Sequence, residues 1–575
     1  MATAVEDAPR PSGAPWWAWI AGLILVLFVG FEVYGPALNG EFVFDDQYLP
    51  FMMPDVQNAP LQAWLGVRPF LQLTYWWNYQ NWGLEPYPYH AVSVVLHCFN
   101  TLLIWAIVRR FLKMVDETGV RREILAAFAA GLFLLHPVIT ESVAYVTSRS
   151  EALSIFFFLL AYAVFLFRPR PAIPVPHIIL LLLFFGIACT VKEHTTFLPF
   201  LLLLTDFWFT TPFRFEGIRR NLHLYIPIAF FGLIGIWAVF KVLSGANSAG
   251  FRLAEFTWYQ YLFTQFRVIW TYLRLYLLPV GQNGDYAFPP SRIITEHFAW
   301  LALFGLLAVC WLAWRYRREY PLASFGWFGF LLLLAPTSSV VPIADVIVER
   351  RLYLPFFCLL LITVDFLRRW RPTPALLASA CGLLLAVSAY AAHERSKVWS
   401  SALVFWGDAA SKAPTNARAR FQLAYAQWVN GQCDAAVRSY EETAKITAKS
   451  DDRLLVDWGL ALECAGRTDD AAAKMRQAYA IAPSAHIQTQ IGMIYGKKNR
   501  FEEAMAALNE AEKLDPRFEM TYVYKGNLYA TRGEVDTAIG FYKHAIAINP
   551  NNQNAKQALD LAEQGKAAAA RQPGR

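Results

Sequence analysis

Charge is scarce in this sequence. Only 17% of its 575 residues are charged, whereas 56% are hydrophobic and the mean hydropathy is +0.31. Lys and Arg outnumber Asp and Glu by 27 to 23 before residue 393 and by 24 to 21 from there on. Neither half has the basic excess of a nucleic-acid-binding domain, so we expect no nucleic-acid partner. The composition instead places most of the chain in a membrane.

Two further signals are missing. The seven cysteines show no metal-ligand spacing, and those in apolar segments are expected to be inert core residues. The first fifteen residues contain Glu6, Asp7 and one Arg10, without the basic region and cleavage site of a signal peptide. We therefore interpret 1–15 as a cytoplasmic tail and the apolar run that follows as a retained anchor.

Long apolar runs dominate the first two thirds of the chain. They predict an all-α, polytopic membrane domain over 16–392 with about eleven transmembrane helices. The eleven runs cover 16–34, 90–108, 124–137, 151–167, 177–191, 195–210, 222–243, 298–314, 322–340, 351–367 and 374–392. The aromatic segment 258–280 carries Arg267 and Arg274, so we place it at the outer membrane interface rather than across the bilayer.

Arginine and lysine clusters decide the predicted orientation. Clusters near residues 109–122, 168–170, 214–220, 315–318 and 368–371 all fall on one side of the predicted helices, which the positive-inside rule makes cytoplasmic. The polar loops then share the extracytoplasmic side. The sequence thus predicts a multi-pass protein of the inner (plasma) membrane, or of the endoplasmic-reticulum membrane with luminal repeats if the source is eukaryotic.

From about residue 400 a period near 34 residues replaces the apolar runs, with prolines at 483, 516 and 550. The small and large residues recur at tetratricopeptide positions, as in Gly459 with Met475 and Gly526 with Tyr542. We predict a junction and half-repeat over 393–414, about four repeats forming an α-solenoid over 415–551, and a capping helix with a disordered tail over 552–575. The repeats are expected to bind a protein partner.

Cys433 and Cys464 fall at helix ends that are neighbours in an antiparallel stack of repeats. In an oxidising compartment they would form a disulfide. The alternative is a pair of buried thiols.

Asp45 and Asp46 lie just after the first apolar run, among Phe42, Phe44 and Tyr48. Charged residues at a membrane edge tend to be functional, and apolar surroundings raise a carboxyl pKa and suit it to act as a base. We predict both as catalytic candidates. The alternative is a solvated helix end or a pair of structural caps.

Three other polar groups interrupt the apolar sequence on the same predicted side. Each has a structural alternative, such as a core histidine, an intramembrane ion pair or arginines bound to lipid head groups. They are His136 and Glu141 with Arg149 to Glu151, then Lys192-Glu193-His194, and then Glu349-Arg350-Arg351 with Tyr353, while Asp285 lies in the long loop after 258–280.

The ordered set of motifs resembles the transmembrane and tetratricopeptide-repeat-containing O-mannosyltransferases. It consists of Phe-Asp45-Asp46, His136-Pro-Val-x-Thr-Glu141, Arg149-x-Glu151, Lys192-Glu193 and Glu349-Arg350-x-Leu-Tyr353-Leu-Pro355, followed by the repeats. The resemblance spans nearly the whole chain and implies a GT-C-class glycosyltransferase, with a prokaryotic relative suggested by the small number of repeats. It implies a polyprenyl-phosphate-linked sugar, of which mannose is one candidate, as donor and Ser or Thr hydroxyls of translocated proteins as acceptors.

With this chemistry we expect Asp45 or Asp46 to take the acceptor proton. The candidates for binding the donor phosphate are Arg350, Arg351, Lys192 and Arg149, and those for positioning substrate are His136, Glu141, Glu193, Glu349, Tyr353 and Asp285. The scheme demands no metal, although it leaves room for a divalent cation. An O-antigen ligase or polymerase, and a non-enzymatic membrane-anchored scaffold, stay open as alternatives.

Overall fold

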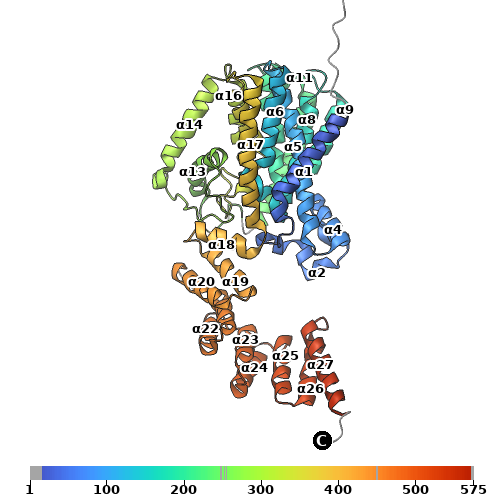
Figure 1. The fold of residues 1–575 in the computed structure, drawn as a ribbon, viewed down its shortest axis with the longest axis vertical. Helices are drawn as coiled ribbons and strands as arrows, with labels where there is room; N and C mark the ends of the chain where they lie inside the picture. Colours follow the sequence, from blue (N-terminus) through green and yellow to red (C-terminus); the bar gives the residue numbers. More distant parts are fainter. Residues whose placement is uncertain (1–15, 246–248, 252, 254, 448–450, 571–575) are drawn as a thin grey trace, which may run out of the picture. The chain divides into compact units, whose positions relative to one another are not determined.

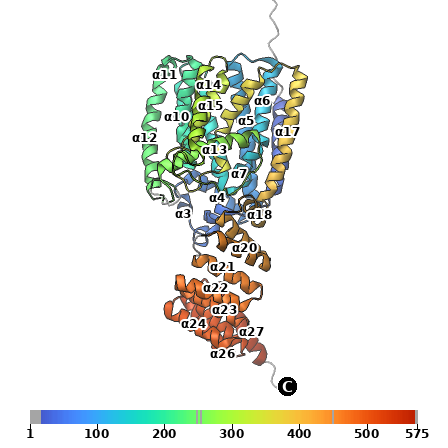
Figure 2. The same cartoon turned by 90° about the vertical axis from the view of Figure 1, so that its left-hand side faces the viewer.

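The computed structural model describes residues 16–245, 249–251, 253, 255–447 and 451–570 as a predominantly helical chain. It has two compact units, Met1–Asp408 and Ala409–Arg575 (Figures 1 and 2). The expected all-α class is confirmed, with apolar helices in the first unit and repeats in the second. The expected cytoplasmic tail 1–15 and the final residues 572–575 lie outside the described residues.

Each of the eleven expected apolar runs contains a helix. Among the described residues, five helices are long and apolar enough to cross a membrane, or six if the bent pair Gly119–Leu135 and Pro137–Ala144 is one span, and the total of about eleven crossings stays a prediction. The helices are α1 (Trp16–Tyr34), α5 (Pro86–Met114), α6 (Gly119–Leu135), α8 (Arg149–Leu166), α9 (Val175–Val191), α10 (Leu198–Thr205), α12 (Leu222–Gly245), α14 (Ala299–Arg315), α15 (Pro321–Leu334), α16 (Phe356–Leu367) and α17 (Pro374–Ser396).

One continuous apolar core lies between α5, α6, α8, α15 and α16. Prolines set several helix boundaries, because the missing N–H is tolerated only in the first turn. Pro86, Pro321 and Pro374 each begin a helix, whereas Pro137 follows α6 and bends the chain by 49° into the short α7 (Thr140–Ala144). This bend places α7 and its Glu141 beside the loop that precedes α16.

Helix α13 (Trp258–Leu277) fills the ambiguous segment. It is not among the helices apolar enough to cross a membrane, and Figure 2 shows it lying across the long helices. Its buried face includes Tyr261, Gln265 and Tyr272, while Arg267 lies over the ring of Phe288. An amphipathic helix of this kind is typical of a membrane interface, and the interfacial placement of α13 stays a prediction.

The first loop folds into short helices over an aromatic core of its own. These are α2 (Pro54–Gln57), α3 (Leu61–Leu65) and α4 (Pro69–Trp82). Phe51, Trp64, Tyr75 and Tyr89 are completely or almost completely buried in this core. The loop is thus a packed layer that can hold the segment of Asp45 and Asp46 in place.

The second unit is a series of helix pairs. They are α19 (Ala417–Val429), α20 (Cys433–Ile446), α21 (Asp452–Cys464), α22 (Thr468–Ile481), α23 (Ala485–Gly496), α24 (Phe501–Leu514), α25 (Glu519–Thr531) and α26 (Val535–Ile548), with α27 (Gln553–Ala570) after them and α18 (Ala402–Lys412) before them. A Cβ at Gly492 would lie 2.6 Å from the Leu508 side chain, and one at Gly526 would lie 2.5 Å from the Tyr542 ring. Glycine is therefore needed where the two helices of a repeat touch.

Cys433 and Cys464 form a disulfide between α20 and α21, with Cα atoms 5.5 Å apart. Of the two states expected for this pair, the structure has the bonded one.

Candidate active site

The loop after α1 begins the site. Phe44 starts the short helix η2 (Phe44–Tyr48) with a left-handed backbone, at φ 55°. Its ring lies 5.4 Å from Trp406 and 6.3 Å from Tyr145, measured between centroids, so aromatic packing holds this uncommon conformation. A bulky residue in this region is costly and is often found where geometry is functional. The next residue is Asp45.

Asp46 is completely buried, and both of its carboxylate oxygens accept hydrogen bonds. Its Oδ1 accepts hydrogen bonds from the amide and the hydroxyl of Thr147, at 2.7 and 2.6 Å, and its Oδ2 accepts one from the amide of Val43 at 3.3 Å. Burial raises the pKa of Asp46 to about 7, although these three donors act to lower it. The geometry gives this carboxylate the capping role that was the alternative in the sequence.

Asp45 is half-buried and differs from its neighbour. Its backbone amide donates to the Tyr145 hydroxyl at 2.8 Å, whereas no described residue donates to its carboxylate. Tyr145 is buried and stacks on Trp399 at 5.3 Å between ring centroids. The backbone of Asp45 is therefore fixed while its carboxylate is left open for a substrate.

Arg350 approaches the same tyrosine. Its guanidinium carbon lies 5.8 Å from the centroid of the Tyr145 ring. Glu141 holds Arg350 at two points, because Oε1 pairs with the guanidinium at 2.5 Å and Oε2 accepts from the Arg350 amide at 3.1 Å. Helix α7 and the short helix η9 (Glu349–Leu352) thus bring a cation close enough to Asp45 for the two charges to interact.

Glu349 points to a different set of groups. It accepts from Gln282 at 2.7 Å, from the Asn283 amide at 2.9 Å and from the Tyr286 hydroxyl at 2.6 Å. Burial raises its pKa, although the charge of Arg395 acts in the opposite direction. Asp285 lies in this loop, and its amide donates to Asn283 at 3.1 Å.

A second ionic cluster surrounds Glu151. Its carboxylate pairs with Lys192 at 2.5 Å and lies 3.4 Å from His194. Glu193 turns away and receives two hydrogen bonds from Arg68, at 2.8 and 3.0 Å. The three consecutive polar residues 192–194 therefore pair with α8 and with the first loop, and not with one another.

Two of the expected phosphate ligands are used internally. Arg149 is 0% exposed, lies 4.5 Å from the Tyr75 ring centroid and donates to the Tyr89 carbonyl at 2.9 Å. Arg351 donates to the carbonyls of Asp345 and Val346, at 2.6 and 3.0 Å. By contrast, the side chains of Arg350 and Lys192 are each 16% exposed. Arg149 is therefore enclosed, whereas Arg350 and Lys192 each keep part of the side chain accessible to a ligand.

Two expected positioning residues lie in the apolar core. His136 has its Nε2 2.9 Å from the Tyr276 carbonyl oxygen and stacks on that tyrosine. The Tyr353 hydroxyl accepts from Asn100 at 3.0 Å and lies 2.8 Å from Nδ1 of His97. These contacts join separate helices, so His136 and Tyr353 have structural roles in the packing around the site.

Among the described residues, no group of three or more His, Cys, Asp or Glu side chains is arranged to hold a metal ion. A divalent cation at the site stays a prediction.

Tyr145 and Thr147 were not singled out from the sequence. They lie between Glu141 and Arg149, and two hydroxyls inside a charged stretch were the available signal. Arg395, which influences Glu349, was also missed, because a basic residue in the last turn of a helix such as α17 is common without any functional role.

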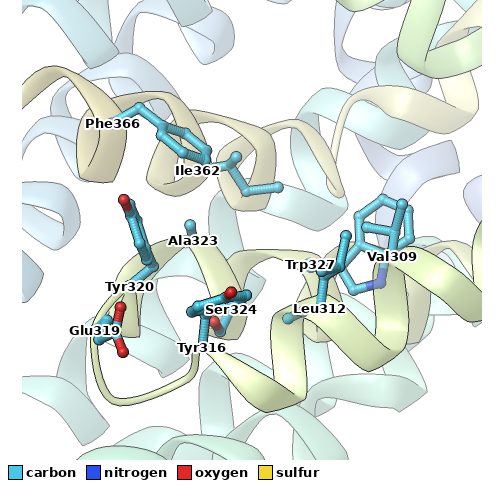
Figure 3. A pocket seen from close by; sticks show the side chains of 11 residues that line it. Val309, Leu312, Tyr316, Glu319, Tyr320, Ala323, Ser324, Trp327, Ile362 and Phe366 are labelled. Carbon is cyan, nitrogen blue, oxygen red and sulfur yellow. The ribbon is translucent and has the colours of Figure 1, made fainter.

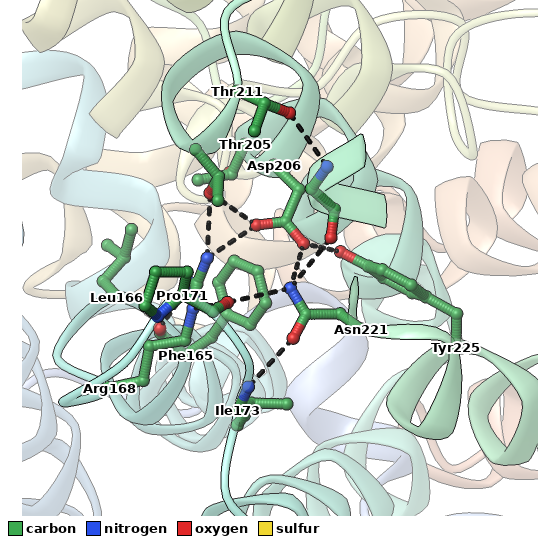
Figure 4. A network of polar contacts seen from close by, with 12 residues as sticks. Phe165, Leu166, Arg168, Pro171, Ile173, Thr205, Asp206, Thr211, Asn221 and Tyr225 are labelled. Carbon is green, nitrogen blue, oxygen red and sulfur yellow. Dashed lines mark hydrogen bonds and ion pairs between the residues drawn. The ribbon is translucent and has the colours of Figure 1, made fainter. Parts of the chain in front are cut away.

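A further polar network was also missed (Figure 4). Asp206 is buried at the end of α10, where Oδ1 accepts from Arg168 at 2.6 Å and Oδ2 accepts from Asn221 and Tyr225, each at 2.7 Å. Arg168 belongs to one of the basic clusters, so the network ties together loops at the arginine-rich end of the unit.

Two tetratricopeptide-repeat family models match the chain, over residues 421–486 and 485–518. A solved structure titled YrrB, a TPR protein with an unusual peptide-binding site, is 20% identical and covers 31% of this chain and 87% of its own, with a TM-score of 0.23. The TPR domain of P58(IPK) is 14% identical and covers 69% of this chain and 95% of its own, with a TM-score of 0.19. Scores this low carry no inference beyond the family models.

Sequence relatives extend over the membrane unit. A protein O-mannosyl-transferase of Caenorhabditis elegans is 25% identical over 454 residues, which are 74% of this chain and 63% of the relative. Human TMTC4 is 25% identical over 74% of this chain and 66% of its own length, and human TMTC1 is 33% identical over 22% of this chain and 16% of its own. The chain thus spans less than two thirds of each of these relatives. Over 74% of its length, its curated homologues are protein O-mannosyl-transferases of the TMTC family.

Proposed function

We propose that this chain is a membrane glycosyltransferase that moves a sugar from a polyprenyl-phosphate carrier to Ser or Thr hydroxyls of translocated proteins. The names of the relatives favour mannose as the sugar. The orientation inferred from the arginine clusters puts the site and the repeats on the extracytoplasmic side of a plasma membrane, or in the lumen if the membrane is the endoplasmic reticulum. The repeats then offer a surface for the acceptor protein.

One observation carries the proposal. Of two adjacent aspartates, Asp46 is buried and accepts three hydrogen bonds, whereas the Asp45 carboxylate is half-buried and meets no donor among the described residues. A general base needs an accessible carboxylate held in a fixed position. The Asp45 carboxylate meets this need, and the hydrogen bonds of the neighbouring Asp46 help to hold the Asp45 backbone in position.

In the proposed reaction, Asp45 accepts the proton of the acceptor hydroxyl while that oxygen attacks the anomeric carbon. A new glycosidic C–O bond forms, the bond to the phosphate oxygen breaks, and the configuration inverts. The electron pair of the broken bond leaves on the polyprenyl phosphate. Cationic groups stabilise this developing charge most effectively when they are already in position.

Arg350 is the first candidate for that role, because Glu141 holds it beside Tyr145 and part of its side chain is exposed. Lys192, held by Glu151, is the second. Arg149 and Arg351 are assigned structural roles through their internal contacts. Glu193, Glu349 and Asp285 are left to orient the loops that meet the substrates.

The proposal is tested with the full chain in lipid nanodiscs, supplied with radiolabelled polyprenyl-phosphate mannose and a pool of Ser/Thr peptides. We expect labelled, alkali-sensitive sugar on the peptides. A ligase or polymerase would instead use a polyprenyl-diphosphate oligosaccharide and leave the peptides unlabelled. Failure with polyprenyl-phosphate glucose, galactose and mannose alike would contradict the proposal.

A further inference from the structure

We propose that the cavity between α14, α15 and α16, at the arginine-rich end of the first unit, binds an aminophospholipid of the phosphatidylethanolamine type. The cavity has a volume of about 540 Å³, within the roughly 300–1,000 Å³ range of small-molecule sites. It lies at the opposite end of α16 from η9 and the candidate active site. It is therefore a separate site and does not depend on the proposed transferase function.

The cavity is polar at one end and apolar at the other (Figure 3). Glu319 and Tyr320, in the turn between α14 and α15, form the polar end. Val309 and Trp327 lie at the far end, and Ile362 with Phe366 covers the cavity from α16. This gradient fits an amphiphile whose head group lies at the turn and whose chain runs along the helices.

The polar end carries charges of both signs. Glu319 is exposed, and no described cationic side chain forms an ion pair with its carboxylate. Two arginines lie on the tyrosines that line the cavity, with Arg369 3.8 Å from the ring centroid of Tyr320 and Arg315 5.4 Å from that of Tyr316. Asp365 lies 3.9 Å from Arg369 but is paired more closely with Arg368, at 2.6 Å.

These charges select the head group. The arginines offer donors to a phosphate, and the Glu319 carboxylate accepts hydrogen bonds from a primary ammonium. A choline head group has no N–H to donate, and a purely anionic head group places negative charge beside Glu319. Of the ethanolamine, choline and glycerol head groups, only ethanolamine offers both an N–H donor to Glu319 and a phosphate to the arginines without added negative charge.

The test uses the purified full chain, stripped of lipid, and three dioleoyl lipids that differ only in the head group. Binding of phosphatidylethanolamine, phosphatidylcholine and phosphatidylglycerol is measured by native mass spectrometry. We expect the ethanolamine lipid to bind about tenfold more tightly than the choline lipid. Glu319→Gln should remove this preference, and Arg369→Gln should weaken both lipids.

Glu216→Gln is the matched control, because Glu216 is an exposed glutamate of α11 (Glu216–Arg220) outside the cavity. It should leave the preference unchanged. Ala323→Phe, which puts a ring into the cavity wall, should lower binding of all three lipids. Equal binding of the ethanolamine and choline lipids by the wild type would overturn the proposal. The proposal would also be overturned if phosphatidylglycerol bound more tightly than phosphatidylethanolamine and if Glu319→Gln strengthened its binding further.

Discussion

The backbone amide of Asp45 donates a hydrogen bond to the hydroxyl of Tyr145, one hundred residues further along the chain, at 2.8 Å. Two residues beyond this tyrosine, Thr147 donates twice to Asp46. The two aspartates are therefore fastened to a single short segment between α7 and α8. These contacts distinguish the two residues, because the Asp46 carboxylate accepts structural hydrogen bonds whereas Asp45 is held through its backbone amide.

Asp46 should make stability depend on pH. Because burial raises its pKa to about 7, the folded protein keeps the proton between pH 4 and 7 while the unfolded chain loses it. The stability gained from this proton is full below the ordinary carboxyl pKa near 4 and is lost as pH rises through about 7. The thermal midpoint in nanodiscs should therefore fall from pH 5 to pH 8. Asp46→Asn should flatten that dependence, and an equal fall in the variant would contradict the assignment.

Breaking the Glu141–Arg350 pair should damage both the fold and the activity. Removing one partner of a buried ion pair costs about 3–5 kcal/mol, because the other charge is left without compensation. Asp365→Asn is a matched control, since Asp365 is also buried and pairs with Arg368 at 2.6 Å away from the site. Both variants should lower the thermal midpoint. Only Glu141→Gln should also lower transfer per folded molecule, measured by single-turnover assay, and equal transfer in both variants would remove Arg350 from the site.

The disulfide between Cys433 and Cys464 should stabilise the repeats. It closes a loop with a sequence separation of 31 residues, for which the chain-entropy model gives about 4 kcal/mol. Cys464→Ser should lower the unfolding midpoint of the repeat helices, followed by circular dichroism in the full chain, and reductant should lower the wild type to the same value. Peptide mapping that found both cysteines freely alkylated without reductant would contradict the bond.

Cysteine labelling tests the proposed orientation. Cysteines introduced at the exposed positions Asn58 and Gln553 should react with a membrane-impermeant maleimide in intact cells, because the arginine clusters place both outside. A cysteine at Glu216, beside Arg219 and Arg220, should react only after permeabilisation. The reverse pattern would invert the topology.

The sequence was most informative where local rules decide the structure. Apolar runs located the helices, the 34-residue period located the repeats, and Arg267 with Arg274 marked α13 as unlike its neighbours. The sequence was least informative about side chains whose ion-pair or hydrogen-bond partners are distant along the chain. Nothing local indicates that Glu193 pairs with Arg68 while Lys192 pairs with Glu151. Asp206 was overlooked because it sits in an apolar run, and its partners come from separate loops.

The same limit applied to the aspartate pair. Position beside the first membrane helix predicted that the pair matters, but separating Asp45 from Asp46 required Tyr145 and Thr147. These contacts join residues about a hundred positions apart, which no sequence period could reveal.

The most direct test is single-turnover sugar transfer by Asp45→Asn, compared with the wild type and with Asp55→Asn, a control at an exposed aspartate of the same loop. Loss of a general base costs about a hundred- to ten-thousand-fold in rate. Asp45→Asn should show a loss of that size while folding and donor binding are kept, and Asp55→Asn should transfer normally. If Asp45→Asn retained more than about a tenth of the wild-type rate, well short of that loss, Asp45 would not be the base.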